Sequence, residues 1–428
     1  MIDKEVKYSY NDLTIKPSIT TSIKHRSECN CFVDDDNNLP IFASPMTSVV
    51  NEDNYEIFKE NGITPIIPRS VSLEKRIDIM SEANWVAMSL KEFEDLFIKN
   101  SNESLNKFGC TYKVCIDIAN GHMSHLYSLC VRAKRKALDI GYDLCIMIGN
   151  IANPKTYKYI MESVEYATKS GYRVPAIDYV RVGIGGGAGC TTTSNVGVHY
   201  PQASLIDECY TYRKHYCGNN YPKIIADGGI RNYNDVIKAL ALGADYVMIG
   251  SVFAQCVESA GMKTTRSGES KTLPFPMKRY KSFTIHNGYV KGFYTDEFIE
   301  KMSESWKKLY DETKEFGPDD PRYAAAYMKY HERLDDLSQE KNIGRMDVVF
   351  FGMASADGQK AISGEKTKTA EGITKRLPVK WTLSQWTENM IAYLRSAMSY
   401  TDHNFLSDFI GGVVLVVNSP QEIQAINK

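Results

Sequence analysis

Three features that would place this sequence in other protein classes are missing from it. None of its ten cysteines forms a C-x-x-C pair, and several, such as Cys115 and Cys145, lie in apolar runs, so we expect buried, reduced thiols and no zinc site. The longest apolar run, residues 409–417, is too short to cross a bilayer. The first twelve residues are largely polar and lack the apolar core of a signal peptide. Together these absences predict a cytoplasmic protein.

An excess of charge of one sign is also missing. The 51 basic and 52 acidic residues leave a formal net charge of −1, so we expect neither nucleic acid nor a membrane surface as a partner. The chain has 428 residues, of which 43% are hydrophobic. It can therefore bury a large core, either in one barrel-type domain or in two domains of ordinary size.

What the sequence does contain is a regular alternation of short apolar runs with helix-compatible stretches such as 123–139, 154–170 and 232–242. Eight strand candidates that alternate with helices predict an α/β fold, a (β/α)8 TIM barrel. A doubly wound open sheet is the alternative, but it rarely sustains eight regular repeats. The strand candidates are residues 39–43, 63–67, 85–89, 114–118, 144–148, 179–182, 224–226 and 246–249.

The alternation stops after Gly261. Residues 262–345 are charged and rich in tyrosine, with helix-compatible stretches at 295–315 and 322–340. This change of pattern predicts an inserted, partly helical subdomain after the eighth strand. The expected domains are a TIM-barrel catalytic domain formed by residues 1–261 and 346–428, and an inserted subdomain formed by residues 262–345.

Two further elements are expected in the last part of the chain. The stretch 363–372 is rich in Gly, Lys and Thr, which suits a mobile flap. A helix is expected over 382–399, because apolar residues recur there at helical spacing. The residues on its apolar face are Trp386, Met390, Ile391 and Leu394.

The sixth strand candidate leads into the most distinctive stretch of the chain. Five glycines fall within residues 183–189, followed by Cys190 and three threonines. Such a loop lets the backbone adopt positive φ angles and approach a ligand closely. Barrel enzymes build their active sites at the carboxyl ends of the strands, so Cys190 is a candidate nucleophile. An incidental cysteine on a surface loop is the alternative, and the neighbouring loops favour the nucleophile.

The last two strand candidates also end in residues suited to ligands. One is followed by a carboxylate and two glycines, which suit a ribose diol, and the other by a glycine and a serine, which suit a phosphate. A nucleotide whose phosphate lies there would present its base to Cys190. The substrate-side residues of the two loops are Asp227, Gly228, Gly229, Gly250 and Ser251.

Several motifs over residues 8–261 and 348–400 resemble those of the IMP dehydrogenase / GMP reductase family. They are GIGGGAGCTT, VGVHYPQ, IADGGIR, GADYVMIGS, FFGM and EG. The resemblance implies that Cys190 attacks C2 of a purine nucleotide and forms a covalent adduct, and that a hydride passes between C2 and a nicotinamide. A thiolate suits this step because it is both a strong nucleophile and a workable leaving group.

The resemblance also implies roles for residues at matched positions. Thr192 and Glu371 would handle ammonia beside Cys190, and a potassium ion would be held by carbonyl groups of the cysteine loop. The residues expected on the substrate side, besides those of the two loops above, are Gly352, Met353, Ala354 and Ser355. Those expected on the cofactor side are Asp117, Asn120, Gly121, Arg69 and Asn150. The potassium carbonyls would be those of Gly185, Gly187 and Cys190.

Within the family, the wording of the motifs favours reductase over dehydrogenase. The opening segment, IDIANGH and VGVHYPQ look like the reductase forms, whereas IADGGIR is closer to the dehydrogenase form. We therefore expect NADPH-dependent reduction of GMP to IMP with release of ammonia, in a homotetramer. The alternatives are an NAD-dependent IMP dehydrogenase that forms XMP, and a catalytically silent nucleotide-binding or scaffold protein.

The sequence departs from the family pattern at four positions. Ala188 stands where the family has a phosphate-contacting serine, Phe350 where it often has a tyrosine, Thr47 where it has an acid, and Arg69 where reductases have a lysine. Each lost hydroxyl removes a hydrogen bond to a charged group, worth about 1.5–3 kcal/mol. The loss of two such hydroxyls predicts a weaker than ordinary affinity for a 5'-monophosphate, and with it a divergent member of the family that has a shifted substrate.

Overall fold

The structure is a computed structural model, and it describes most of the chain. It covers residues 4–99, 109–216, 220–265, 341–365 and 369–426, the strand segments 280–286 and 289–294, and a few isolated positions from 300 to 325. The helices predicted at 295–315 and 322–340 lie largely outside the described residues.

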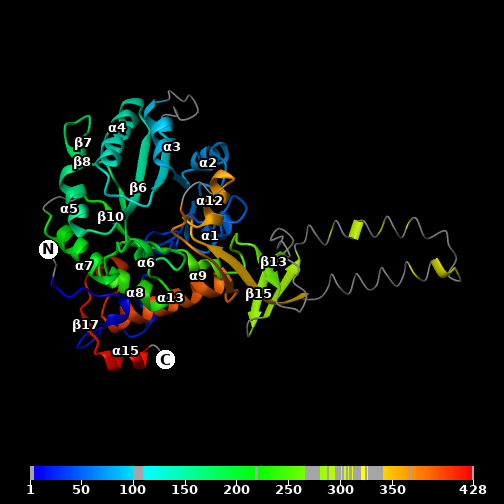
Figure 1. Ribbon diagram of the computed structural model, residues 1–428. Coiled ribbons are helices and arrows are strands. Elements are labelled where there is room, and N and C mark those ends of the chain that lie inside the picture. Colours follow the sequence, from blue (N-terminus) through cyan, green and yellow to red (C-terminus); the bar gives the residue numbers. More distant parts are fainter. Residues whose placement is uncertain are drawn as a thin grey trace.

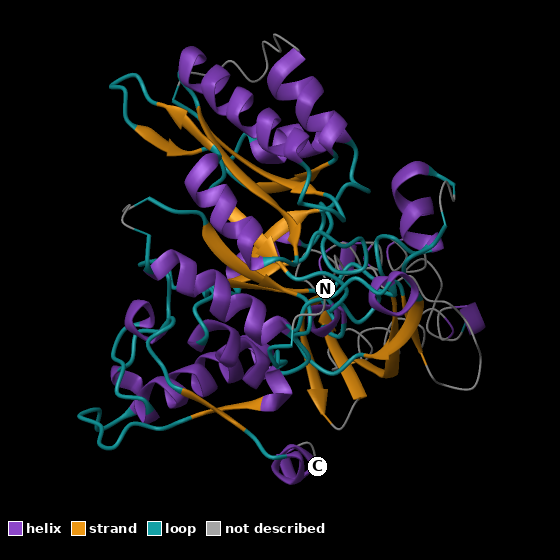
Figure 2. Ribbon diagram, turned by 60° about the vertical axis from the view of Figure 1, so that its left-hand side comes forward, coloured by secondary structure: helices purple, strands orange, loops and turns teal. Residues whose placement is uncertain are grey.

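A closed barrel of eight parallel strands forms the centre of the molecule, which confirms the predicted (β/α)8 architecture (Figure 2). Each predicted strand is present, and the order around the barrel follows the order along the chain. Short β-branched runs are buried on both faces in such a barrel, which explains why they read as continuous apolar runs. The strands are β2 (Ile41–Ala43), β3 (Thr64–Ile67), β4 (Trp85–Met88), β5 (Thr111–Asp117), β6 (Asp143–Ile151), β9 (Tyr179–Val182), β10 (Lys223–Asp227) and β11 (Tyr246–Ile249).

Large side chains fill the barrel interior. Phe42, Trp85 and Tyr179 pack edge to face, with ring centroids 5.2–6.0 Å apart, and Met147 and Ile225 belong to the same buried cluster. The barrel is therefore a packed core and not a pore. A ligand has to lie in the loops at its end.

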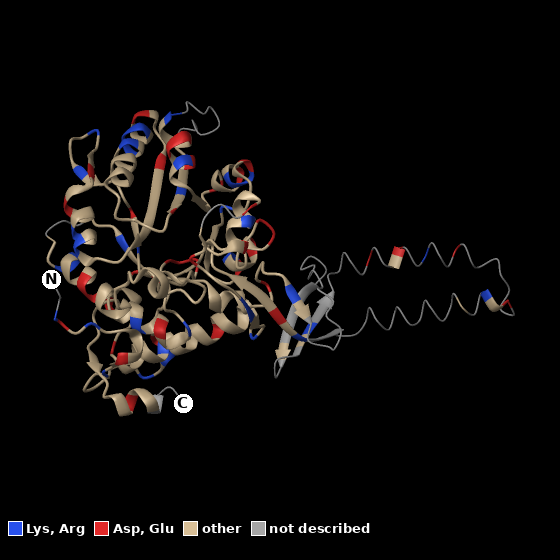
Figure 3. Ribbon diagram, in the orientation of Figure 1, with Lys and Arg blue, Asp and Glu red and all other residues tan. Residues whose placement is uncertain are grey.

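Helices cover the outside of the barrel, where basic and acidic residues are interspersed (Figure 3). Helices α4 and α8 match the predicted spans. The predicted helix 154–170 is wrong beyond Ser163, because the chain turns there into a hairpin whose residues Val164 and Tyr166 pack against the core. The helices are α1 (Tyr55–Glu60), α2 (Leu73–Met80), α3 (Leu90–Glu94), α4 (Ser124–Ile140), α5 (Pro154–Ser163), α6 (Thr192–Val196), α7 (Gln202–Lys214), α8 (Tyr233–Ala241) and α9 (Ser251–Ala254), with the helical turn η3 (Asp95–Lys99) and the hairpin strands β7 (Glu165–Ala167) and β8 (Arg173–Pro175).

An antiparallel sheet stands beside the barrel (Figure 1). Its long strand crosses the expected domain boundary at residue 345 without a break, and residues 346–351 belong to this sheet and not to the barrel. The described residues of the insertion are thus mainly strands that extend from the wall of the site. The strands are β12 (Lys263–Thr265), β13 (Tyr280–His286), β14 (Tyr289–Tyr294), β15 (Lys341–Phe351) and β16 (Thr374–Pro378), and α12 (Ala356–Ser363) lies between the last two in the chain.

The two ends of the chain meet on the outside of the barrel. Strand β1 (Leu13–Ile15) pairs with β17 (Leu415–Val417), and the predicted last helix is present as α13 (Leu383–Tyr400). Trp386, Met390 and Leu394 are fully buried, as the predicted apolar face requires. The remaining short elements are η1 (Tyr10–Asp12), η2 (Arg26–Glu28), α14 (Leu406–Phe409) and α15 (Pro420–Ile426).

The packing of α13 gives a test of this arrangement. Leu394→Ala should lower the free energy of unfolding by about 2–5 kcal/mol, because it removes a fully buried side chain and leaves a cavity. Glu388→Ala, on the exposed face of the same helix, should change it by less than about 0.5 kcal/mol. Urea unfolding followed by circular dichroism measures both. Equal effects of the two substitutions would contradict the packing.

Candidate active site

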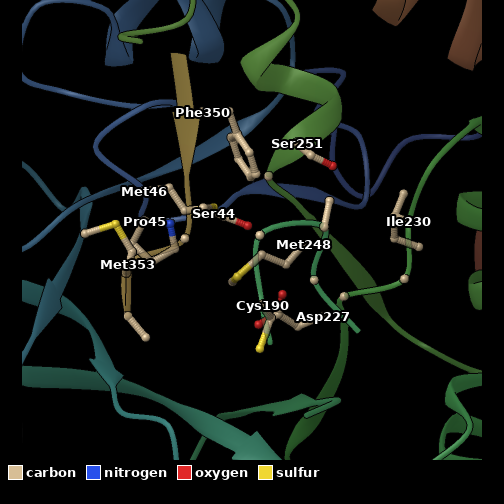
Figure 4. A pocket seen from close by; sticks show the side chains of 18 of the residues that line it. Ser44, Pro45, Met46, Cys190, Asp227, Ile230, Met248, Ser251, Phe350 and Met353 are labelled. Atoms are coloured by element: carbon tan, nitrogen blue, oxygen red, sulfur yellow. The ribbon is translucent and has the colours of Figure 1, made fainter. Parts of the chain in front are cut away.

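A pocket of about 220 Å³ lies at the carboxyl ends of the barrel strands, the end at which barrel enzymes carry their active sites. Loops of the barrel form most of its wall, and Phe350 at the end of β15 adds to it (Figure 4). Glu371 also lines the pocket. Most of the residues predicted from the sequence line it. These are Asp117, Gly187, Cys190, Asp227, Gly228, Gly229, Gly250, Ser251, Gly352, Met353, Ala354 and Glu371.

The other predicted residues lie outside the pocket lining. Thr192 bonds to two lining residues, as described below. Ser355 is buried and its hydroxyl accepts a hydrogen bond from the amide of Gly358, which caps α12. Gly121 donates its amide to the carbonyl of Asn150 at 2.8 Å. The predicted residues that lie outside the lining are Thr192, Ser355, Arg69, Asn120, Gly121, Asn150 and Gly185.

Backbone contacts between glycines position the cysteine loop. A Cβ atom on Gly189 would lie 2.9 Å from the amide nitrogen of Gly352, and one on Gly372 would lie 2.9 Å from the carbonyl oxygen of Gly189. Side chains at these positions would push the segments apart. The amide of Ile373 also donates to the carbonyl of Gly189 at 3.0 Å, and that of Thr191 to the carbonyl of Glu371 at 3.0 Å. The loop after β9 is thereby joined to the segments on both sides of α12.

These contacts bring three predicted catalytic residues into one row. The Cys190 thiol lies 3.2 Å from the Thr192 hydroxyl, which lies 3.2 Å from the Glu371 carboxylate. Among the nine cysteines that the structure describes, Cys190 is the only exposed one. By contrast, burial raises the pKa of the Cys115 thiol to about 12. The row offers a nucleophile, a hydroxyl that can relay a proton, and a general acid or base.

A buried arginine lies beneath the row. Arg181, on β9, is 7% exposed; its guanidinium donates to Asp117 at 2.8 Å and to Asp227 at 2.9 Å. Burial by itself would lower the pKa of Arg181, but Asp227 and Asp117 raise it well above its ordinary value, so the side chain stays charged. The amide of Asn150 also donates to Asp227, at 2.7 Å. Arg181 therefore holds in one unit Asp117, which the sequence predicts on the cofactor side, and Asp227, which it predicts on the substrate side.

Arg69, which the sequence predicts on the cofactor side, lies behind Asp117. Arg69 donates to the carbonyl of Asp117 at 3.4 Å, and its Nε lies 4.0 Å from the Glu92 carboxylate. This Nε is buried and makes no hydrogen bond with the described residues. Arg69 therefore lies behind Asp117 and outside the pocket lining, and its buried Nε is not accessible to a ligand in the pocket.

The predicted potassium carbonyls are partly engaged. The carbonyl of Gly185 accepts from the Thr193 hydroxyl at 3.2 Å, and that of Gly187 accepts from the amide of Cys190 at 3.0 Å. The loop in this conformation does not present three free carbonyls to one ion. Potassium binding stays a prediction, and no chemical step is assigned to it.

The sequence prediction missed Arg181, Ile230 and Met248, which all line the pocket. For Arg181 a signal existed, because a charged residue within the apolar run YVRV has to be paired once the strand is buried. For Ile230 and Met248 no signal distinguishes a pocket wall from an ordinary core position.

Comparisons with known proteins give a family match and named relatives. The family model described as "IMP dehydrogenase / GMP reductase domain" matches residues 7–284. The GMP reductase of Vibrio vulnificus (strain YJ016) is 30% identical over 305 residues, which cover 68% of this chain and 81% of that protein. The protein named GMP reductase 2 of Bos taurus is 29% identical over 312 residues, or 69% of this chain and 82% of that protein.

Arg181 gives the site a test that is independent of activity. Arg181→Met should lower the free energy of unfolding by about 1–3 kcal/mol, because two partly buried carboxylates lose their cation. Arg181→Lys keeps the charge and should cost less. Urea unfolding of both variants provides the measurement, and a methionine variant as stable as the parent protein would show that the ion pairs do not hold the site.

Proposed function

The chain belongs to the IMP dehydrogenase / GMP reductase family of oxidoreductases, and we propose that it reduces GMP to IMP with NADPH and releases ammonia. The observation that carries the proposal is the row from Cys190 through Thr192 to Glu371 at the edge of a pocket that also contains Asp227. The relatives named above are all called GMP reductase, which supports this direction of reaction.

In the proposed reaction, Cys190 acts as the nucleophile. Its sulfur forms a bond with C2 of the guanine, and the bond between C2 and the exocyclic nitrogen breaks. The Glu371 carboxyl group, through the Thr192 hydroxyl, gives that nitrogen the proton with which it leaves as ammonia. When bound, NADPH would supply the hydride that replaces sulfur at C2. Cys190 then leaves as a thiolate, so the enzyme returns to its starting state.

The remaining residues orient the reactants. Asp227, held by Arg181 and Asn150, is suited to accept hydrogen bonds from the two ribose hydroxyls. Asp117 lines the same pocket, and Arg69, which donates to the Asp117 carbonyl from behind the lining, would help to position it toward the cofactor. NADPH is the proposed cofactor and NADH the alternative.

The proposed function also includes an oligomeric state and a cellular location for the protein. No helix in the part of the chain that the structure describes is long and apolar enough to cross a membrane. We propose a cytoplasmic homotetramer that binds a purine nucleotide and no nucleic acid, with potassium as an optional ligand of the cysteine loop. Light scattering coupled to size-exclusion chromatography measures the assembly.

Two parallel absorbance assays at 340 nm test the activity. A loss of NADPH in the presence of GMP is expected, together with formation of ammonia. A gain of NADH from IMP and NAD would instead identify an IMP dehydrogenase. If neither assay responds while purine nucleotides still raise the melting temperature, the chain is a nucleotide-binding protein without this activity.

Substitutions in the row predict graded losses. Cys190→Ser should reduce kcat more than about 10³-fold, because the nucleophile is lost, and should abolish the purine adduct seen by mass spectrometry of the intact protein. Glu371→Gln should reduce kcat about 10²–10⁴-fold, because proton transfer is lost. The matched control is Cys110→Ser, a half-buried cysteine outside the pocket. A Cys190→Ser enzyme with parental activity would overturn the proposed chemistry.

A further inference from the structure

We propose that Lys375 supplies the cation that binds the phosphate of the nucleotide in this chain. The inference rests on the proposed function, since it concerns the same pocket. It concerns the pocket end formed by the loops after β10 and β11, where Gly250 and Ser251 line the pocket and the Ser251 side chain carries a hydroxyl; the amide of Gly229 already donates to the carbonyl of Gly186. Lys375 takes no part in the proposed reaction at C2.

The pocket by itself has the wrong charge for a phosphate. Its lining contains three carboxylates, those of Asp117, Asp227 and Glu371, and one cation, Arg181. That guanidinium is already bonded to Asp117 and Asp227. Among the described residues no lysine lines the pocket. A phosphate group would therefore enter a space of net negative charge and would need a cation from outside the lining.

The phosphate end of the pocket is also poor in hydroxyl groups. Ala188 and Phe350 line it, and neither offers a hydrogen bond from its side chain. Figure 4 shows Phe350 and Ser251 at one end of the pocket, away from Cys190 and Asp227. The neutral donors at this end are thus the backbone amides and the hydroxyl groups of Ser251 and Ser44.

Lys375 lies next to both of these apolar residues. It is the cross-strand partner of Phe350 in the pairing of β15 with β16, so the two side chains project from the same face of the sheet. Its ammonium group donates to the carbonyl of Ala188 at 2.9 Å. Gly189, the next residue of the loop, lies directly against the Phe350 ring, since a Cβ atom there would be 3.1 Å from the ring. The lysine thus reaches the loop at the point where it passes the phosphate end.

The chemistry of the ammonium group suits this role. It has three hydrogen-bond donors, and the single partner found for it within the described residues is the Ala188 carbonyl. Lysine binds phosphate as a compact point charge. The side chain is exposed in the absence of ligand, so it can turn from the carbonyl toward an anion without a change in the backbone.

The test compares ligands with and without a phosphate. Lys375→Gln should raise the Kd of GMP by about tenfold or more, which corresponds to the loss of one charge-assisted hydrogen bond, and should leave the Kd of guanosine unchanged. In turnover assays the KM for GMP should rise while kcat changes little. Lys375→Arg should retain most of the affinity. Calorimetry provides the Kd values and does not depend on turnover.

The matched control is Arg376→Gln. Arg376 is the next residue of β16 and is also exposed, but alternation along the strand directs it to the other face of the sheet. The Arg376→Gln substitution should leave the Kd of GMP unchanged. Equal losses from both variants would show that only diffuse charge matters, and equal losses for GMP and guanosine would show that Lys375 does not read the phosphate; either result overturns the inference.

Failure of the proposed function gives a different result. If the parent protein binds GMP but does not turn it over, the proposed reaction is wrong, and Lys375→Gln still decides the inference through the Kd. If the parent protein binds guanosine as tightly as GMP, it has no phosphate subsite and the inference is overturned, whatever the assays of turnover give.

Discussion

The close backbone contact between the cysteine loop and the segments around α12 is the constraint on which the site depends. Cys190 and Thr192 follow a barrel strand, whereas Glu371 lies nearly two hundred residues later. The row between them exists only because Gly189 can lie against Gly352 and Gly372. A side chain on any of these glycines would separate the nucleophile from its proton donor. The glycines therefore set the catalytic geometry although they carry no reactive group.

A second constraint comes from inside the barrel. The aromatic and apolar cluster around Phe42, Trp85 and Tyr179 fills the interior, so ligands are confined to the rim. Directly below the rim, Arg181 neutralises Asp117 and Asp227. The packed core confines the ligand to the rim, and the ion pairs with Arg181 fix the orientation of the Asp117 and Asp227 carboxylates there.

Much of this could be predicted from the sequence, and the rest could not for physical reasons. The eight barrel strands and most pocket residues follow from local patterns, since strand ends in a barrel converge on one face. The hairpin of β13 and β14 did carry a local signal, the dipeptide NG at residues 287–288 between two strand-compatible runs. The rest of the antiparallel sheet was missed because β15 pairs with β12, β14 and β16, which lie far apart in the chain, and such pairing leaves no local period. Lys375 was missed for the same reason: its neighbours Phe350 and Ala188 become neighbours only through strand register.

The continuity of β15 has a mechanical consequence. The strand runs without a break from Lys341 to Phe351, about 35 Å at the usual rise per residue, and its far half pairs with β14 while its near half pairs with β16. One end of β15 thus forms part of the pocket wall, and its other end lies in the antiparallel sheet outside the barrel. A β-bulge interrupts the register of the far half with β14 between Asn342 and Gly344, whereas the near half pairs in continuous register with β16. A displacement of β16 would therefore be passed directly to Phe350 and to the pocket wall.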